Sequence, residues 1–358
     1  MKDLNAPWLG CNAIGNSNST QLNPKQLYFG LLKNQPQKST LTQSQQFLRQ
    51  QLNKVSSKPT DLPQTVEALM DWMRANTASV GEQYHDYLTQ RQQGQGPRYF
   101  PTKSHALYFL KAVAPTKLVD GAWLYGLINQ WHDSRYTELI KIYLEELGDG
   151  EADKNHVVLY QKLLATHECT HWENLPEANF IQGAIQLSLA QHTAEFLPEV
   201  IGFNLGYEQL PLHLLICAYE LAEWDIDPYY FSLHVTIDNA DTGHAARAVQ
   251  AVLDNMPKLA DPAAFYQRVR NGYMLNTLGV STTQIIAAFD LEQELLNILA
   301  TKAVTGAQLH SDYCRLGGKT INEWLADPKQ ILEFINVLID KGWIHRNQDP
   351  SNLSLIHI

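Results

Sequence analysis

Thiol groups, long apolar runs and positive charge are all scarce in this chain of 358 residues. Its four cysteines, Cys11, Cys169, Cys217 and Cys314, lie far apart and include no Cys-x-x-Cys pair. This spacing argues against a disulfide framework or a thiolate zinc site and favours a reducing compartment. No apolar run approaches the ~20 residues that a membrane helix requires, and the opening "MKDLNAPWLGC" lacks the apolar segment of a signal peptide. We therefore expect a cytoplasmic protein with no membrane partner.

The charge balance is acidic, with 37 Asp and Glu against 27 Lys and Arg. Proteins that bind nucleic acids usually present a basic face to the phosphate backbone. We therefore expect no nucleic-acid partner. The hydrophobic fraction of 44% is typical of a globular protein, and the length suffices for one large or two modest domains.

Three regions differ in composition along the chain. Residues 1–61 are polar and rich in Gln, Ser and Asn, and we interpret them as a loosely ordered N-terminal arm with room for one docked helix. Residues 62–275 carry apolar residues at helical spacing without an alternating strand pattern, which predicts an all-α bundle. Residues 276–358 predict a small C-terminal appendage, helical or winged-helix-like, in which "KGWIH" is a candidate strand.

His234, Asp238, Asp241 and His244 fall within eleven positions of an otherwise apolar stretch. On one continuous ideal helix, at ~100° per residue, the first three share a face, and His244 reaches that face only through a local distortion. Buried carboxylate and imidazole groups are costly unless they are paired, hydrogen-bonded or bound to metal. The stretch therefore predicts either a polar core cluster or a metal site.

Other predicted helices offer further donors. Glu146 ends one predicted helix and His156 begins the next, across a turn that contains glycine. Glu208 lies among apolar residues in "GFNLGYEQL", as Asp120 does in "KLVDGAWLYGL". Facing helices that each present an inward carboxylate or imidazole build dinuclear iron or manganese sites in helical bundles. Such a donor set without thiolate suits iron or manganese, with zinc as a further option.

The order of these motifs resembles the iron-containing redox enzyme family, the haem-oxygenase-like diiron oxidases and oxygenases, over about residues 100–260. The matching parts are "EELGDG" with a His ten residues after its second Glu, the Glu of "GFNLGYE", and "DPYYFSLHVTIDNADTGHA". The resemblance implies a haem-oxygenase-like bundle over 62–275, two non-haem iron ions and O₂ as cosubstrate. It also implies a small organic substrate that undergoes N-oxygenation, desaturation or oxidative C–C cleavage. The implied iron ligands are Glu146, His156, Glu208, His234 and Asp238.

The sequence departs from the family pattern at the last ligand. The family usually has a His three residues after the Asp, where this chain has Asp241, and His244 follows three residues later. The last ligand is therefore Asp241 or His244, or else one iron is held weakly or two metals never bind together. No catalytic residue other than the metal ligands is assigned.

The motif "HECTH", residues 167–171, offers a rival metal site. H-E-x-x-H on a helix is a signature of zinc hydrolases, with two His ligands and a Glu base, and Glu195 is a candidate third ligand. The motif also contains an E-x-x-H pair of the ferritin-like type, as does Glu82-x-x-His85.

Two alternatives to an iron oxidase stay open. One is a zinc metallohydrolase that uses "HECTH". The other is a non-enzymatic helical binding module whose buried polar groups are only hydrogen-bonded. A homodimer is compatible with each of these readings. In "YELAEW", we interpret Glu220 and Glu223 as part of a solvated helix face.

Overall fold

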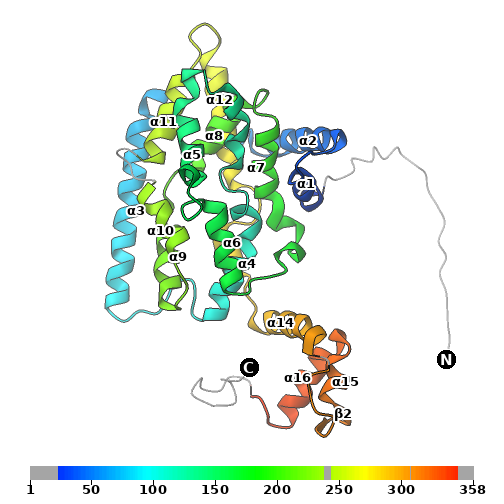
Figure 1. Cartoon of the computed structure of the whole chain (residues 1–358). Coiled ribbons are helices and arrows are strands. Elements are labelled where there is room, and N and C mark those ends of the chain that lie inside the picture. Colours follow the sequence, from blue (N-terminus) through cyan, green and yellow to red (C-terminus); the bar gives the residue numbers. More distant parts are fainter. Residues whose placement is uncertain (1–22, 238–242, 307, 346–358) are drawn as a thin grey trace, which may run out of the picture.

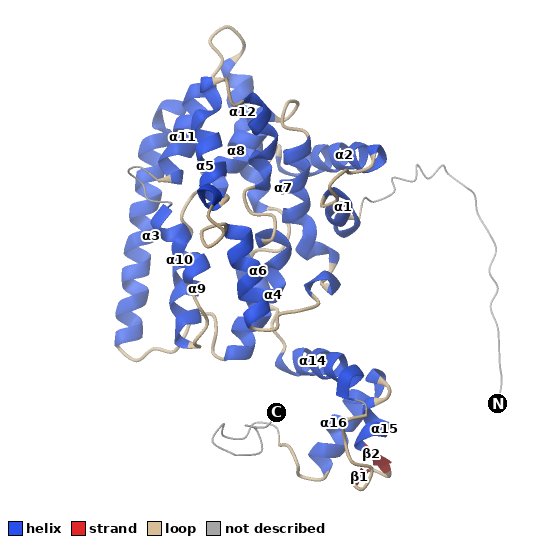
Figure 2. Cartoon of the chain, viewed as in Figure 1, coloured by secondary structure: helices blue, strands red, loops and turns tan. Residues whose placement is uncertain are grey.

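The computed structural model describes residues 23–237, 243–306 and 308–345 of the chain. These residues form helices throughout, with one short hairpin near the C-terminal end (Figure 2). The prediction of an all-α fold is therefore confirmed. In the described ranges, no helix combines the length and the apolar character that crossing a membrane would require.

A bundle of helices between residues 69 and 274 forms the body of the molecule (Figure 1). Apolar side chains from these helices pack into two buried clusters. Polar caps define several helix starts: Asn155 accepts a hydrogen bond from the Val158 amide (3.0 Å), and Asp261 accepts one from the Ala263 amide (2.9 Å). The helices of the bundle are α3 (Leu69–Gln92), α4 (Lys103–Lys117), α5 (Thr137–Glu146), α6 (His156–Thr166), α7 (Ile181–Gln191), α8 (Leu197–Tyr207), α9 (Leu212–Glu223), α10 (Tyr229–Ile237), α11 (His244–Asn255) and α12 (Pro262–Met274).

Helices α8 and α12 lie side by side with their backbones nearly in contact (Figure 1). A Cβ atom on Gly202 of α8 would lie 1.8 Å from the carbonyl oxygen of Val269 in α12. A Cβ atom on Gly272 of α12 would lie 2.2 Å from the carbonyl oxygen of Glu199. Because these positions have no room for a side chain, glycine is what allows the two helices to approach. Glu208, the C-cap residue of α8, is buried.

Two helices precede the bundle, α1 (Pro24–Leu31) and α2 (Lys38–Val55), and both pack against α7. Their apolar residues are few but recur at helical spacing, and Tyr28 and Leu48 are fully buried in the main core. This part of the chain is therefore not the loosely ordered arm that its polar composition suggests. A composition average hides a narrow apolar stripe on an otherwise polar helix. The region boundaries at 61 and 275 stay a prediction.

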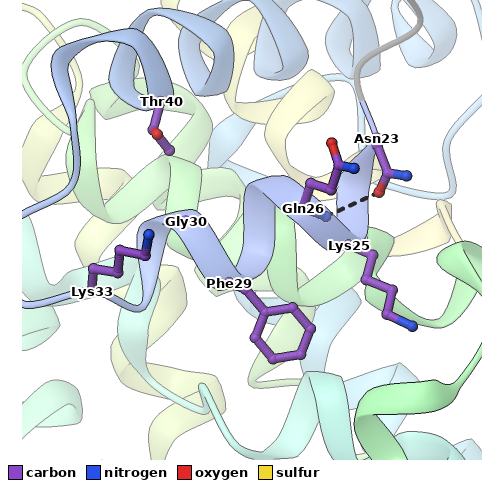
Figure 3. Close-up of a pocket in the computed structure, with 7 residues that line it drawn as sticks. All are labelled: Asn23, Lys25, Gln26, Phe29, Gly30, Lys33 and Thr40. Atoms are coloured by element: carbon purple, nitrogen blue, oxygen red, sulfur yellow. Dashed lines mark hydrogen bonds between the residues drawn. The ribbon is translucent and has the colours of Figure 1, made fainter.

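An open hollow lies against α1, with Thr40 of α2 on its far side (Figure 3). The Lys25 side chain at its edge fastens α1 to the bundle. Its ammonium donates a hydrogen bond to the carbonyl oxygen of Leu175 (3.1 Å) and lies 5.3 Å from the ring centre of Phe180. The residues that line the hollow are Asn23, Lys25, Gln26, Phe29, Gly30, Lys33 and Thr40.

The C-terminal part lies beside one end of the bundle (Figure 1) and has a small apolar core of its own. Its elements are α13 (Thr282–Ala287), α14 (Leu291–Gly306), β1 (Arg315–Leu316), β2 (Lys319–Thr320), α15 (Ile321–Leu325) and α16 (Ile331–Asp340). Gly317 and Gly318, with φ of 58° and 87°, form the turn of the antiparallel hairpin. An ion pair between Lys111 of α4 and Glu294 ties α14 to the bundle. The expected strand at "KGWIH" is wrong: Gly342, with φ of 70°, ends α16 in a turn.

Glu220 on α9 is fully buried, so its interpretation as part of a solvated face is wrong. Its carboxylate accepts a hydrogen bond from the Tyr87 hydroxyl (2.7 Å) and from three consecutive backbone amides of residues 98–100 (2.5–2.8 Å). Four donors satisfy a buried carboxylate and stabilise its charge. Glu220 therefore fixes the loop before α4 against α9, whereas Glu223 forms a partly exposed ion pair with Arg91.

The environment of His213, in the first turn of α9, should make the free energy of unfolding depend on pH. Burial and the nearby ammonium of Lys117 lower its pKa from 6.5 to about 4. Between these two values the unfolded chain binds a proton at this position and the folded chain does not, so stability falls as the pH falls. We expect His213→Gln to remove up to about 1 kcal/mol per pH unit from the slope of unfolding free energy between roughly pH 6.5 and 4.

Urea unfolding of the metal-free protein at a series of pH values measures this slope. The matched control is His85→Gln, because His85 is exposed on α3 and its loss should leave the slope unchanged. Identical slopes for wild type and His213→Gln would contradict the prediction.

Candidate metal centre

The stretch that carries His234 and His244 is interrupted rather than one continuous helix. Helix α10 ends at Ile237, and α11 begins at His244 after Gly243, whose backbone is extended (φ −80°, ψ −170°). The expectation that one continuous helix carries both His234 and His244 is therefore wrong, because the backbone is extended at Gly243. Glycine is unfavourable inside a helix, and Gly243 is the sequence signal for this break. Asp238 and Asp241 fall in 238–242, outside the described residues.

A first group of donors converges where α5, α6 and α10 meet the loop after α4. Asp120, Glu146, His156 and His234 each offer a ligand atom, and these atoms all lie within 4.8 Å of one another. The Asp120 Oδ2 atom lies 3.4 Å from His234 Nε2 and 3.9 Å from His156 Nδ1. His156 Nδ1 lies 2.5 Å from Glu146 Oε2. All four residues are buried, so the group is closed off from bulk water.

A second group shares one member with the first. Glu146, Glu208 and His244 also bring ligand atoms within 4.8 Å of one another. His244 Nδ1 lies 3.0 Å from Glu208 Oε2 and 3.6 Å from Glu146 Oε1. Glu146 thus directs one carboxylate oxygen to each group. A shared carboxylate between two donor groups is the arrangement of a dinuclear site in a helical bundle.

The buried donor atoms provide the test of whether a metal suits this site. Among the described residues, six atoms of the two groups form no hydrogen bond of good geometry, although His156 Nδ1 and Glu146 Oε2 lie 2.5 Å apart: Asp120 Oδ1, Glu146 Oε2, His156 Nδ1, His156 Nε2, Glu208 Oε1 and His234 Nε2. Each such buried polar atom costs ~1–3 kcal/mol when nothing satisfies it. Cations would satisfy carboxylate oxygens and imidazole nitrogens that converge in this way. The residues present therefore fit a metal centre.

The charges of the first group depend on one another. Burial alone would lower the pKa of His156, but the carboxylates of Glu146 and Asp120 outweigh burial and raise it. Burial alone would raise the pKa of Asp120, but Lys117 and His234 outweigh burial and lower it. The carboxylates of Glu146 and Asp120 therefore favour the protonated form of the His156 imidazole. A metal ion that binds here competes with protons for this imidazole.

Local backbone geometry brings Glu146 and His156 together. The turn between α5 and α6 contains Gly148, Asp149 and Gly150, which have φ of 69°, 52° and 89° in succession. Three left-handed residues reverse the chain within one short turn, and two of them are glycine because this region disfavours other side chains. The last residue of α5 and the first of α6 then face the same space.

A glycine in the loop after α4 leaves the space for Glu146. Gly121 has φ of 77°, and a Cβ atom there would lie 2.9 Å from Glu146 Cβ and 3.2 Å from Glu146 Cγ. Gly121→Ala would displace the carboxylate that both donor groups share. We expect metal affinity to fall at least about tenfold, the range typical for the loss of a group that orients a ligand.

A cobalt(II) titration of the purified variants measures this effect. Gly94→Ala is the matched control, because Gly94 also has positive φ (89°), lies after α3 away from the donor groups, and has no atom within 4 Å of a Cβ built there. Both variants carry the same kind of backbone strain, so equal affinities would mean that contact with Glu146 is irrelevant.

Several residues beside the donors are absent from the expected ligand set. The family motifs begin at Glu146, so the sequence marks Asp120 as an inward carboxylate but not as a ligand. The structure places Asp120 in the first donor group. The Tyr230 hydroxyl donates a hydrogen bond to Asp120 Oδ2 (2.5 Å). Lys117 donates one to the Tyr207 hydroxyl (3.2 Å). A charged residue inside an apolar run is the only sequence signal that marks Asp120.

The "HECTH" motif lies outside any helix. Helix α6 ends before it, His167 follows as the C-cap, and Glu168 and His171 have left-handed backbones with φ of 51° and 61°. The zinc-hydrolase signature needs its two His on successive turns of one helix. Glu195, the candidate third ligand, instead forms an ion pair with Arg49. The helical arrangement expected for this motif is therefore wrong.

The other E-x-x-H pair, Glu82 and His85, is exposed on α3. Neither it nor "HECTH" belongs to a group of three or more candidate ligands in the described part of the chain. The two donor groups around Glu146 thus carry the case for a metal site.

Comparison with known proteins agrees with this location. The model of the family described as "Iron-containing redox enzyme" matches residues 107–276, which contain both donor groups. No curated protein and no solved structure matches the chain. The all-α architecture is consistent with the haem-oxygenase-like helical fold of that family. Residues 107–276 of this chain therefore match the iron-containing redox enzyme family.

Proposed function

We propose that this protein is a non-haem diiron oxidase or oxygenase, which activates O₂ and oxidises a small organic substrate. The observation that carries the proposal is the pair of buried donor groups that share Glu146. The donors are carboxylates and imidazoles without thiolate, a set that suits iron. The match to the iron-containing redox enzyme family supports the same metal.

The proposed centre assigns the donors to two ions. Asp120, His156 and His234 would hold one ion, Glu208 and His244 the other, and Glu146 would bind both. Asp238 and Asp241 stay predicted as further ligands of the pair. A bound iron pair would supply the electrons that reduce O₂.

The protein's own residues contribute binding and shielding. Asp120, Glu146 and Glu208 are buried carboxyl groups, and in their ionised forms they would compensate the charge of divalent cations. The Tyr230 hydroxyl holds the Asp120 carboxylate in orientation through its hydrogen bond. Buried aromatic rings, including Tyr160 beside Tyr230 (centroids 4.7 Å apart), wall the site and keep water out. N-oxygenation, desaturation and oxidative C–C cleavage are the three proposed outcomes for the substrate.

Metal analysis under anaerobic conditions tests the proposal. The protein would be purified without oxygen, reconstituted with excess Fe(II), desalted and analysed by mass spectrometry of its metals. We expect about two iron ions per chain, and O₂ consumption when the loaded protein meets air-saturated buffer. One tightly held zinc that disappears with His167→Ala would support the zinc hydrolase instead. A protein that binds no metal would be a helical binding module.

A further inference from the structure

Both ring nitrogens of His244 meet carboxylates, and the two carboxylates come from different helices. Nε2 lies 2.8 Å from Glu145 Oε2, at the end of α5. Nδ1 lies 3.0 Å from Glu208 Oε2, at the end of α8. Glu145 and Glu146 are consecutive residues, so α5 presents one carboxylate to each side of the same imidazole. The ring of His244 is only 1% exposed and is therefore held in this orientation.

Glu145 has a fixed position of its own. Its Oε1 atom forms an ion pair with the Arg247 guanidinium, one turn after His244 on α11. The Arg247 amide donates a hydrogen bond to the carbonyl oxygen of Gly243 (3.1 Å), which anchors the start of α11. Glu145 and Arg247 are each 29% exposed, so this pair lies at the edge of the site, between the buried donors and solvent.

The arrangement selects one protonation pattern of the imidazole. A neutral His carries one N–H, and the hydrogen bond at one nitrogen decides which nitrogen keeps a lone pair. The Glu145 carboxylate, charged and paired with arginine, is an acceptor that takes the N–H of Nε2. Nδ1 then faces Glu208 Oε2 (3.0 Å) and Glu146 Oε1 (3.6 Å), so its lone pair points to the place where a cation held by those two carboxylates would lie.

We propose that Glu145, held by Arg247, is a positioning residue that directs His244 Nδ1 to the metal ion shared with Glu146 and Glu208. The inference rests on the proposed metal centre. It also explains how this chain, which has Asp241 where the family usually has a His ligand, obtains an imidazole ligand from His244. A carboxylate that accepts the second N–H of a ligating His orients the ring and raises its basicity. Glu145 thereby gives the second ion its imidazole ligand.

Cobalt(II) titration of the full chain tests the proposal, with the visible absorption of bound cobalt as a readout that is independent of activity. The variants are Glu145→Gln, His244→Ala and the two combined. The matched control is Glu223→Gln, because Glu223 also pairs with an arginine but contacts no donor of the site. We expect Glu145→Gln to weaken the second cobalt about 10- to 100-fold and to alter its absorption bands, with the first cobalt unaffected.

The combined variant shows whether Glu145 acts through His244. If it does, Glu145→Gln causes no further loss once His244 is alanine. An additional loss in the combined variant, or a second cobalt bound as tightly by Glu145→Gln as by wild type, overturns the inference and leaves the metal centre standing. A wild-type chain that binds no cobalt at all would instead refute the proposed function.

Discussion

Gly202→Ala is expected to lower the free energy of unfolding by at least about 2 kcal/mol, because the new methyl group would enter the backbone of α12. Overpacking of a core typically costs ~1–3 kcal/mol. Here the obstructing atom is the Val269 carbonyl oxygen, 1.8 Å from the Cβ position, and a carbonyl of a packed helix has little freedom to move. The higher helix propensity of alanine stabilises the folded state by only ~1 kcal/mol, which does not offset this cost. Chemical denaturation followed by circular dichroism measures the difference.

The control for this experiment changes the same residue type in the same way. Gly81 lies within α3, is exposed, and has no atom within 4 Å of a Cβ built on it. Gly81→Ala should therefore raise the unfolding free energy by ~0.5–1 kcal/mol, through helix propensity alone. The two substitutions thus have opposite expected signs. A Gly202→Ala protein as stable as Gly81→Ala would show that α8 and α12 are not in backbone contact.

Glu146→Gln is expected to remove both iron ions, whereas loss of a donor in only one group should remove one. The substitution keeps the volume of the side chain but removes the negative charge from Glu146, which both groups share among the described residues. Glu208→Gln should leave about one ion per chain, held by the other group. Metal analysis after Fe(II) reconstitution measures both, and the metal-free variants should retain the helical circular dichroism of wild type.

His167→Ala serves as the control, because His167 lies outside both donor groups. It should bind as much iron as wild type. Wild-type iron content in Glu146→Gln, or loss of iron in His167→Ala alone, would contradict the assignment of the centre to Glu146.

The helices and most candidate ligands were accessible from the sequence because both depend on local pattern. Apolar spacing marked the helices of the bundle, and motif order marked Glu146, His156, Glu208, His234 and His244, which the structure brings into two adjoining groups. Their role as ligands stays a prediction, as does that of Asp238 and Asp241.

The remaining features depend on contacts between distant segments. Asp120 and Glu145 lie beside the other donors only because distant helices pack together. No local sequence pattern predicts that packing. Nothing in the helical pattern around Glu220 indicates that it is buried. Its carboxylate is buried because amides of a loop about 120 residues earlier donate hydrogen bonds to it. The burial of α1 likewise depends on α7, which follows more than a hundred residues later.

The position of α12 in the chain constrains when the protein can mature in a cell. Its Tyr266 and Tyr273 hydroxyls donate hydrogen bonds to Pro63 O and to the Asp61 carboxylate, each 2.9 Å, and its backbone covers the glycines of α8. A ribosome therefore releases every described candidate ligand before it releases the helix that closes the bundle. Contacts across such long sequence separations form late in folding. Iron loading should accordingly follow completion of synthesis, and a nascent chain stalled before residue 262 should expose the apolar flank of α8 to chaperones.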